Sequence, residues 1–161
     1  MKIIVVGTGT IGSAFKRTVE EHGHEVISLG RSSGEFQADI RDMATLRPLF
    51  ERLAPFDAVA SAAGDVFPGP LQETTDEQWD NSIRSKGMGQ INLVRAALPT
   101  IADGGSFTLI SGVLTDEAVH HGTIGATINF LVEGFVKSAA TEMPRGIRIN
   151  CISPTVLAES V

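Results

Sequence analysis

Short apolar runs alternate with helix-length segments along this chain, and that alternation constrains the fold more than any other feature. The runs occupy residues 3–6, 25–29, 36–40, 57–60, 106–110 and 147–151. Short, continuous apolar runs are typical of parallel strands that are covered on both faces. Crossovers of this length join parallel strands by right-handed connections. We therefore expect a single domain over residues 1–161, an α/β fold of the Rossmann-like, doubly wound type. The parallel sheet should have the strand order 3-2-1-4-5-6, with helices on both faces.

The segments between the runs carry apolar residues at helical spacing. Asp42 is placed to cap the helix that follows the third run, and Pro48 should bend or shorten that helix. Two longer helices are expected over residues 82–98 and 123–142.

Composition narrows the classes of partner. The net charge of −6 argues against a non-specific nucleic-acid surface or an anionic-membrane surface. No apolar run approaches the roughly 20 residues that a membrane-spanning helix needs. Cys151 is the only cysteine, so the sequence offers no cysteine-rich metal site and we expect no metal. These features are typical of a cytoplasmic protein that acts on a small molecule.

A glycine-rich turn, Gly7-Thr8-Gly9-Thr10-Ile11-Gly12, separates the first predicted strand from the first predicted helix. Gly7 permits a tight turn, Gly9 lets the backbone approach a pyrophosphate, and Gly12 allows close packing of helix on strand. Thr10 and Ile11 lie at the helix start, where free amide groups favour an anion. This strand–turn–helix context predicts a dinucleotide site, the alternative being a glycine turn without a ligand.

The residues after the second predicted strand indicate which dinucleotide is preferred. A site for NAD usually has an acidic residue there, whereas this chain has Gly30, Arg31, Ser32 and Ser33. A guanidinium with adjacent hydroxyls suits a 2′-phosphate. We therefore expect NADP(H) in preference to NAD(H), unless Arg31 is only a solvated loop residue.

Several further segments, together with this turn, resemble the short-chain dehydrogenase/reductase family. The resemblance runs from Met1 to about Thr155 and is carried by five motifs: Asp39-Ile40, Ser61-Ala62-Ala63-Gly64, Ala96-Ala97-Leu98-Pro99, Gly146-Ile147-Arg148-Ile149-Asn150 and Ile152-Ser153-Pro154. The resemblance implies that Asp39 and Ile40 meet the adenine ring. It also implies that Ala62, Ala63 and Gly64 line the cofactor site.

The catalytic positions of that family do not match. By the resemblance, the usual serine falls at Gly112, the tyrosine at Gly125, the lysine at Asn129 and the asparagine at Lys86. The chain contains no tyrosine at all, and glycine offers no titratable proton. The family's usual tyrosine-based mechanism is therefore excluded for this chain, and Asn129 is the residue left to hold the nicotinamide ribose.

Three other residues are candidates for the missing proton donor: Lys86, Ser111 and His121. A buried lysine can have a lowered pKa, and a histidine donates protons near neutral pH. The alternatives are an interface or solvated Lys86, a surface His121 beside His120, and a Ser111 bonded only to local backbone. Glu133 and Lys137 are one helical turn apart, which indicates an i, i+4 ion pair.

Two hypotheses of function follow. The first is an NADP(H)-binding oxidoreductase with a non-standard active site that acts on a small carbonyl or alcohol. The second is a catalytically silent NADP(H)-binding sensor or assembly module. A homo-oligomer is expected through the helices near residues 82–98 and 123–142, where Gly87 and Gly89 would permit close approach. The family's seventh strand is not expected, because the last residues carry no further strand or helix signal; the chain is either a short form or a piece of a longer one.

Overall fold

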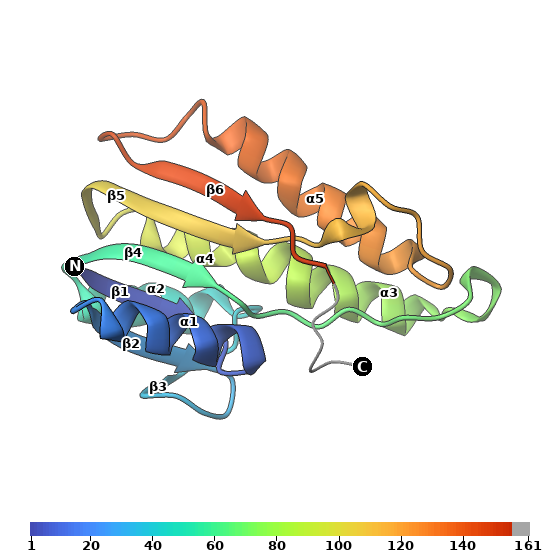
Figure 1. Cartoon of the computed structure of the whole chain (residues 1–161), viewed down its shortest axis with the longest axis horizontal. Helices are drawn as coiled ribbons and strands as arrows, with labels where there is room; N and C mark the ends of the chain where they lie inside the picture. Colours follow the sequence, from blue (N-terminus) through green and yellow to red (C-terminus); the bar gives the residue numbers. More distant parts are fainter. Residues whose placement is uncertain (156–161) are drawn as a thin grey trace.

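The computed structural model describes residues 1–155 and contains one six-stranded parallel sheet, in the order β3-β2-β1-β4-β5-β6. The predicted strand order is therefore confirmed. Figure 1 shows the strands running in one direction, so their carboxyl ends gather at one edge. The strands are β1 (Lys2–Val6), β2 (Glu25–Gly30), β3 (Phe36–Gln37), β4 (Phe56–Ser61), β5 (Ile101–Ile110) and β6 (Arg148–Ile152).

Helices cover both faces of the sheet, as expected for this fold. Helix α1 (Thr10–Glu21) lies alone in front of the sheet in Figure 1, and α2 (Met43–Leu53), α4 (Gly89–Ala97) and α5 (Thr123–Ala139) lie behind it. A π-helical stretch, η2 (Ile83–Met88), joins α3 (Asp76–Ser82) to α4. The described residues also include two short 3-10 turns, η1 (Leu71–Glu73) and η3 (Val113–Thr115).

The alternation of side chains along the strands divides the core into two parts. Ile4 and Val6 of β1 point into the large cluster under α2, α4 and α5, which also contains Phe50 and Phe107. The intervening residues, Ile3 and Val5, belong to a small cluster with Val26, and Val19 of α1 packs against it. Because both faces of β1 are buried, its position in the sheet is fixed, and with it the turn that follows.

Helix α2 is not shortened at Pro48, because it runs without a break from Met43 to Leu53. Asp42 caps it as predicted, its side chain accepting a hydrogen bond from the Ala44 amide at 2.9 Å. Pro48 lies on the exposed side of the helix, where water can satisfy the carbonyl that loses its partner.

Strand β3 is also shorter than predicted and ends at Gln37. Ala38 still donates to the Gly30 carbonyl at 3.0 Å, and the chain then turns at Asp39, whose carbonyl accepts from the Asp42 amide at 2.9 Å. This turn brings Asp39 and Ile40 to the carboxyl edge of the sheet.

The predicted long helix over residues 82–98 is interrupted by the π-helical stretch around Lys86. Gly87 and Gly89, expected to admit a neighbouring subunit, face the interior of this chain instead. A Cβ on Gly87 would lie 3.4 Å from Leu131, and one on Gly89 would lie 2.6 Å from Ile40. These glycines serve the packing of the helix within its own fold.

Within residues 1–155 the sheet has the six strands above, and residues 156–161, where part of the expected strand-free end falls, lie outside the described residues. Over the described part of the chain, no helix combines the length and apolar character needed to cross a bilayer.

Candidate cofactor cleft and active site

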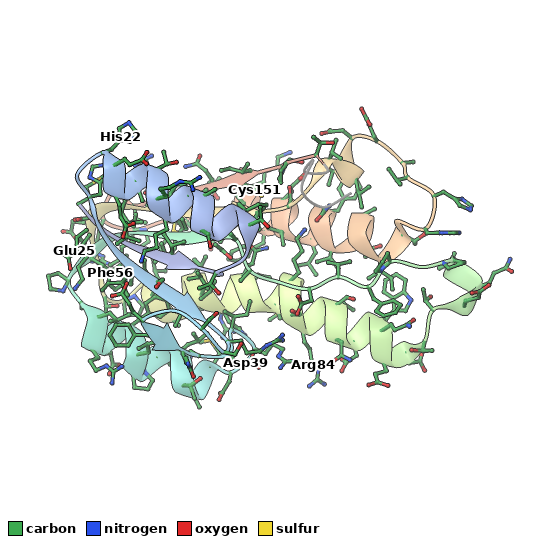
Figure 2. All side chains as sticks on the ribbon, turned by 60° about the horizontal axis from the view of Figure 1, so that its bottom comes forward. His22, Glu25, Asp39, Phe56, Arg84 and Cys151 are labelled. Carbon is green, nitrogen blue, oxygen red and sulfur yellow. The ribbon has the colours of Figure 1, made fainter. Side chains whose placement is uncertain are left out.

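A cleft of about 310 Å³ opens at the carboxyl ends of β1, β2 and β4. Strand β1 is the point at which the strand order reverses, which is where ligands bind in open α/β sheets. Figure 2 shows the two ends of the sheet: Glu25 and Phe56 mark where strands begin, whereas Asp39 and Cys151 lie where strands end. The cleft therefore occupies the edge at which the functional side chains collect.

The glycine turn forms the floor of this cleft, and its three glycines have different surroundings. Gly7 has a φ of 103°, and a Cβ there would lie 2.6 Å from the Ala62 carbonyl oxygen. A Cβ on Gly12 would lie 1.8 Å from the Gly7 carbonyl oxygen, so α1 packs directly on the turn. By contrast, no atom lies within 4 Å of a Cβ built on Gly9.

Gly9 is also the N-cap of α1 and provides no side-chain cap, which leaves the first amides of the helix free for a ligand. Open space above Gly9, unused amide donors and the positive end of the helix dipole fit a pyrophosphate. The residues present therefore suit a dinucleotide.

Most of the predicted cofactor residues come together in this cleft. Its lining includes Gly7, Gly9, Arg31, Ser32, Asp39, Ile40, Ala62, Ala63 and Gly64. Four predicted residues do not line it. Thr10 and Gly12 stand in the first turn of α1 behind the floor, Ile11 faces a separate apolar hollow beside Phe15, and Asn129 lies deeper, on α5.

Two arginines and two acids stand at the mouth of the cleft. Arg31 Nη1 lies 3.4 Å from Asp65 Oδ2, and Arg41 Nε lies 2.9 Å from both carboxylate oxygens of Asp39. The hydrogen bond from the Arg41 side chain is the main reason why the pKa of Asp39 is lowered. Arg41 and Asp65 were not predicted as site residues, although Arg41 directly follows the Asp39-Ile40 pair.

A second polar group lies deeper, where α5 and η2 meet the end of β5. Lys86 Nζ donates to the Ser111 carbonyl at 2.6 Å and to Asn129 Oδ1 at 2.7 Å. Asn129 Nδ2 donates in turn to the Gly112 carbonyl at 3.1 Å. Burial lowers the pKa of Lys86. The stem of Lys86 packs on Gly64, which lines the cleft, so this inner cluster adjoins the cofactor cleft.

Ser111 and Glu133 complete the inner cluster. The Ser111 hydroxyl, in a residue only 3% exposed, donates to Glu133 Oε1 at 2.6 Å, and Thr115 donates to the same oxygen at 3.0 Å. Glu133 therefore faces the end of β5, and the ion pair predicted with Lys137 does not form among the described residues. Burial raises the pKa of the nearby Cys151 thiol.

The end of β5 is held by a residue that the sequence-based reasoning missed. Gln90 is completely buried; its Nε2 donates to the Ile110 carbonyl at 2.7 Å and its Oε1 accepts from the Ile110 amide at 2.8 Å. The available signal was a glutamine at helical spacing from Leu93, Val94 and Ala97, which are apolar. These two bonds fix Ser111 and Gly112 relative to α4.

The position that the family resemblance assigns to tyrosine is filled by apolar side chains. A Cβ on Gly125 would lie 2.8 Å from Leu114 Cδ1 and 3.6 Å from Val66 Cγ1. The structure thus leaves no space for a phenol ring at Gly125 without moving Leu114.

His121 lies apart from the other proton-donor candidates. Its φ of 64° places it in the left-handed region, its ring centroid lies 4.1 Å from that of His120 with the two rings tilted by 36°, and its side chain is exposed. Of the three candidates, the structure brings Lys86 and Ser111 together and leaves His121 in the loop before α5. No group of three or more potential metal ligands occurs among residues 1–155.

Comparison with known proteins supports a dinucleotide-binding oxidoreductase fold for this chain. A family model described as enoyl-(acyl carrier protein) reductase matches residues 6–160. An uncharacterised NAD-dependent oxidoreductase of Mycobacterium tuberculosis is 33% identical over 147 residues, which cover 86% of this chain and 50% of the relative. The chain thus spans about half the length of this relative.

Two solved structures are similar along nearly the whole chain. The Listeria innocua protein lin1944 is 44% identical, with a TM-score of 0.95 over 99% of this chain and 80% of that one. A small-chain dehydrogenase crystallised with NADPH is 28% identical, with a TM-score of 0.88 over 96% of this chain and 69% of that one. Together with the sheet order and the glycine-lined cleft, these matches show that the chain belongs to the short-chain dehydrogenase/reductase family.

Proposed function

We propose that this protein is an NADP(H)-dependent oxidoreductase that transfers a hydride to or from a small carbonyl or alcohol substrate. Family membership supports the reaction class, and the cleft supports the cofactor. The glycine turn and the start of α1 would hold the pyrophosphate. Ala62, Ala63 and Gly64 would form the wall that leads to the nicotinamide end.

The observation that carries this proposal is the place of Lys86. The stem of its part-buried side chain lies against Gly64, its pKa is lowered, and two of the three ammonium hydrogens are engaged by Ser111 and Asn129. The third ammonium hydrogen has no partner among the described residues, and we assign it to the substrate. An ammonium that is held in place and has a lowered pKa is suited to proton donation nearer neutral pH than a solvated lysine is.

The roles of the chain's own groups follow from these contacts. A bound nicotinamide would supply or accept the hydride. Lys86 would donate the accompanying proton to a carbonyl oxygen, and Asn129 would orient the ammonium through its Oδ1. Ser111 is engaged with Glu133 and so supports the site rather than offering a free hydroxyl.

The preference for NADP(H) rests on Arg31, with Arg41 beside it in the same cleft. Guanidinium groups recognise a phosphate through charge-assisted hydrogen bonds. The NADPH complex of the structural relative is consistent with this preference, whereas the Mycobacterium tuberculosis relative is named NAD-dependent.

A catalytically silent NADP(H)-binding module is the second candidate. The packing of Leu114 and Val66 against Gly125 favours it, because that packing fills the space expected for the family's acid/base residue. In this case the cleft would bind the cofactor as a sensor or as part of an assembly.

Titration and turnover separate the two candidates. We would titrate the protein with NADPH and NADH by fluorescence, and then measure NADPH consumption against a panel of carbonyl compounds. Lys86→Met keeps the stem that packs on Gly64 but removes the ammonium, and Lys137→Met is the matched control on the exposed side of α5.

The oxidoreductase is supported if turnover is lost in Lys86→Met, is kept in Lys137→Met, and NADPH still binds to both. In the wild type, reduction should also slow as the pH rises through the lowered pKa of Lys86, below the usual value of about 10.4. Binding without turnover on any substrate supports the silent module. Failure to bind either dinucleotide contradicts both candidates.

A further inference from the structure

Four charged side chains, Arg31, Asp39, Arg41 and Asp65, form a quartet at the mouth of the cofactor cleft, and all four line it. They make two ion pairs, Arg31 with Asp65 and Arg41 with Asp39. Because the formal charges cancel, the mouth is not the simple cationic site that Arg31 alone suggests. The two arginines differ in how firmly they are held.

Arg41 is held tightly. Its Nε donates to both oxygens of Asp39 at 2.9 Å, and its Nη2 donates to the same carboxylate. The Arg41 amide also donates to Asp39 Oδ1, at 2.9 Å. Several hydrogen bonds within three consecutive residues keep this guanidinium in place.

Arg31 is held weakly. Its only side-chain partner among the described residues is Asp65, through one contact of 3.4 Å, and the two side chains are 63% and 78% exposed. Ion pairs of this kind contribute little in water. Of the two guanidiniums, Arg31 is therefore the one that a ligand can take over.

Asp65, by contrast, stands on a fixed segment. Its amide donates to the buried Ser85 hydroxyl at 2.9 Å, and the Phe67 amide donates to the buried Ser82 hydroxyl at 3.0 Å. Asp65 follows β4 and Arg31 follows β2, so the pair crosses the end of β1 between them, beyond the glycine turn. A dinucleotide on that turn would extend its adenosine half toward this pair.

We propose that Asp65 is a specificity-determining residue, whose carboxylate competes with the 2′-phosphate of the cofactor for Arg31. It thereby weakens the preference for NADP(H) over NAD(H). This inference rests on the proposed function in one respect only, that a dinucleotide occupies the cleft. It does not depend on catalysis.

The competition acts on NADP(H) alone. A 2′-phosphate must replace Asp65 as the partner of Arg31, and it is also repelled by the Asp65 carboxylate. NAD(H) carries a 2′-hydroxyl and meets neither effect. Because both side chains are exposed, we expect removal of the charge to strengthen NADPH binding by about three- to tenfold, with little change for NADH.

The test is a set of dissociation constants measured by fluorescence titration with NADPH and NADH. Asp65→Asn removes the charge while keeping the shape of the side chain. Asp103→Asn is the matched control, because it makes the same change of net charge in another exposed ion pair, with Arg145, at the amino end of β5. Each protein is titrated at about 0.02 M and about 0.5 M salt, over which the Debye length falls from roughly 20 Å to roughly 4 Å.

The inference predicts tighter NADPH binding in Asp65→Asn at low salt, a smaller gain at high salt, and no gain in Asp103→Asn. In an Arg31→Gln background, the gain from Asp65→Asn should shrink by at least half, because the residue competed for is absent.

Three results would overturn it: unchanged NADPH affinity in Asp65→Asn, equal gains for NADPH and NADH, or a gain of full size in the Arg31→Gln background. Each leaves the proposed function standing, provided that wild-type protein binds NADPH. A wild type that binds neither dinucleotide overturns the proposed function and this inference together.

Discussion

Glu133 stabilises the end of β5 by accepting hydrogen bonds from two hydroxyls, of Ser111 and Thr115. Glu133→Ala would leave the buried Ser111 hydroxyl without its carboxylate partner. We expect a loss of about 1–3 kcal/mol in the free energy of unfolding. Glu133→Gln keeps an acceptor oxygen at this place, and its loss should stay within about 1 kcal/mol. Urea denaturation of the variants measures both.

Lys137→Ala is the control for this prediction. Lys137 is exposed on the next turn of α5, so its removal should change the stability by no more than about 0.5 kcal/mol. If Lys137→Ala lowers the free energy of unfolding as much as Glu133→Ala does, Lys137 is the main partner of Glu133, and the contacts of Glu133 with Ser111 and Thr115 are secondary.

The Asp39–Arg41 pair predicts a dependence of stability on pH. The hydrogen bond from Arg41 lowers the pKa of Asp39 in the folded protein relative to the unfolded chain. A lowered carboxyl pKa contributes stability above the unfolded value of about 3.9, and that contribution is lost as the pH falls through the folded value. Asp39→Asn should therefore melt below wild type at pH 7, and the gap in melting temperature should narrow progressively as the pH falls below about 4. A gap that does not narrow at all as the pH is lowered would contradict the assignment.

Lys86 and Asn129 show why single positions were hard to interpret from the sequence. By the family resemblance, Lys86 stands where asparagine is usual and Asn129 stands where lysine is usual. The structure brings the two side chains within 2.7 Å of each other. Considered separately, each position looks like the loss of a residue that the family usually has. The contact shows instead that an amide and an ammonium have exchanged helices, and only the packing of η2 against α5 reveals this exchange.

At the scale of elements, the join between β1 and α1 offers a matched pair of substitutions. A methyl group on Gly12 would meet the Gly7 carbonyl at 1.8 Å, whereas one on Gly9 would meet no protein atom within 4 Å. Gly12→Ala must push α1 away from the strand, and we expect it to cost about 1–3 kcal/mol or more. Gly9→Ala should cost no more than about 1 kcal/mol.

Cofactor binding should separate these variants in a different way. The methyl of Gly9→Ala stands where a pyrophosphate would approach the backbone, so NADPH should bind at least about tenfold more weakly in a protein that remains well folded. Thermal denaturation and fluorescence titration give the two measurements. Normal NADPH affinity in Gly9→Ala would place the pyrophosphate elsewhere.

Most elements of the sheet could be predicted from the sequence, because buried parallel strands leave continuous apolar runs such as that of β1. The exceptions have physical causes. The spacing of Ile83, Ile91 and Val94 on either side of the π-helical stretch η2 also fits an ordinary α-helix, so periodicity cannot detect the π-helical stretch. Strand β5 begins at Ile101, before the glycines at 104 and 105, where turn residues conceal the pairing of Ile101 with Phe56.

The inner cluster was harder to predict than the cleft for a related reason. The cleft residues lie in short segments next to strand ends, so topology alone brings Gly7, Arg31 and Ala62 together. Glu133 reaches Ser111 across 22 residues of sequence through the orientation of α5, and Gln90 reaches Ile110 across 20. Such contacts depend on how a helix is rotated, which the apolar stripe defines only approximately.

At the scale of the whole molecule, several large apolar side chains remain exposed, and two of these places lie on opposite faces of the sheet. Phe130 on α5 is 57% exposed, and Met88 at the end of η2 is 37% exposed. On the other face of the sheet, Ile152 of β6 is 56% exposed and Phe15 of α1 is 37% exposed. Among the described residues nothing covers either place, so each is a candidate contact between copies of the chain.

We expect a homo-oligomer assembled through the helices, with Phe130 in the contact. A carboxylate at the centre of an apolar contact carries a desolvation cost of several kcal/mol, so Phe130→Glu should shift the protein to monomers. Light scattering on a size-exclusion column measures the mass, and Leu71→Glu, at an exposed residue of η1, is the control that should leave it unchanged. Because Phe130 is exposed, the substitution should not unfold the monomer. Dissociation by Ile152→Glu instead of Phe130→Glu would place the contact on the sheet, and a monomeric wild type would contradict the prediction outright.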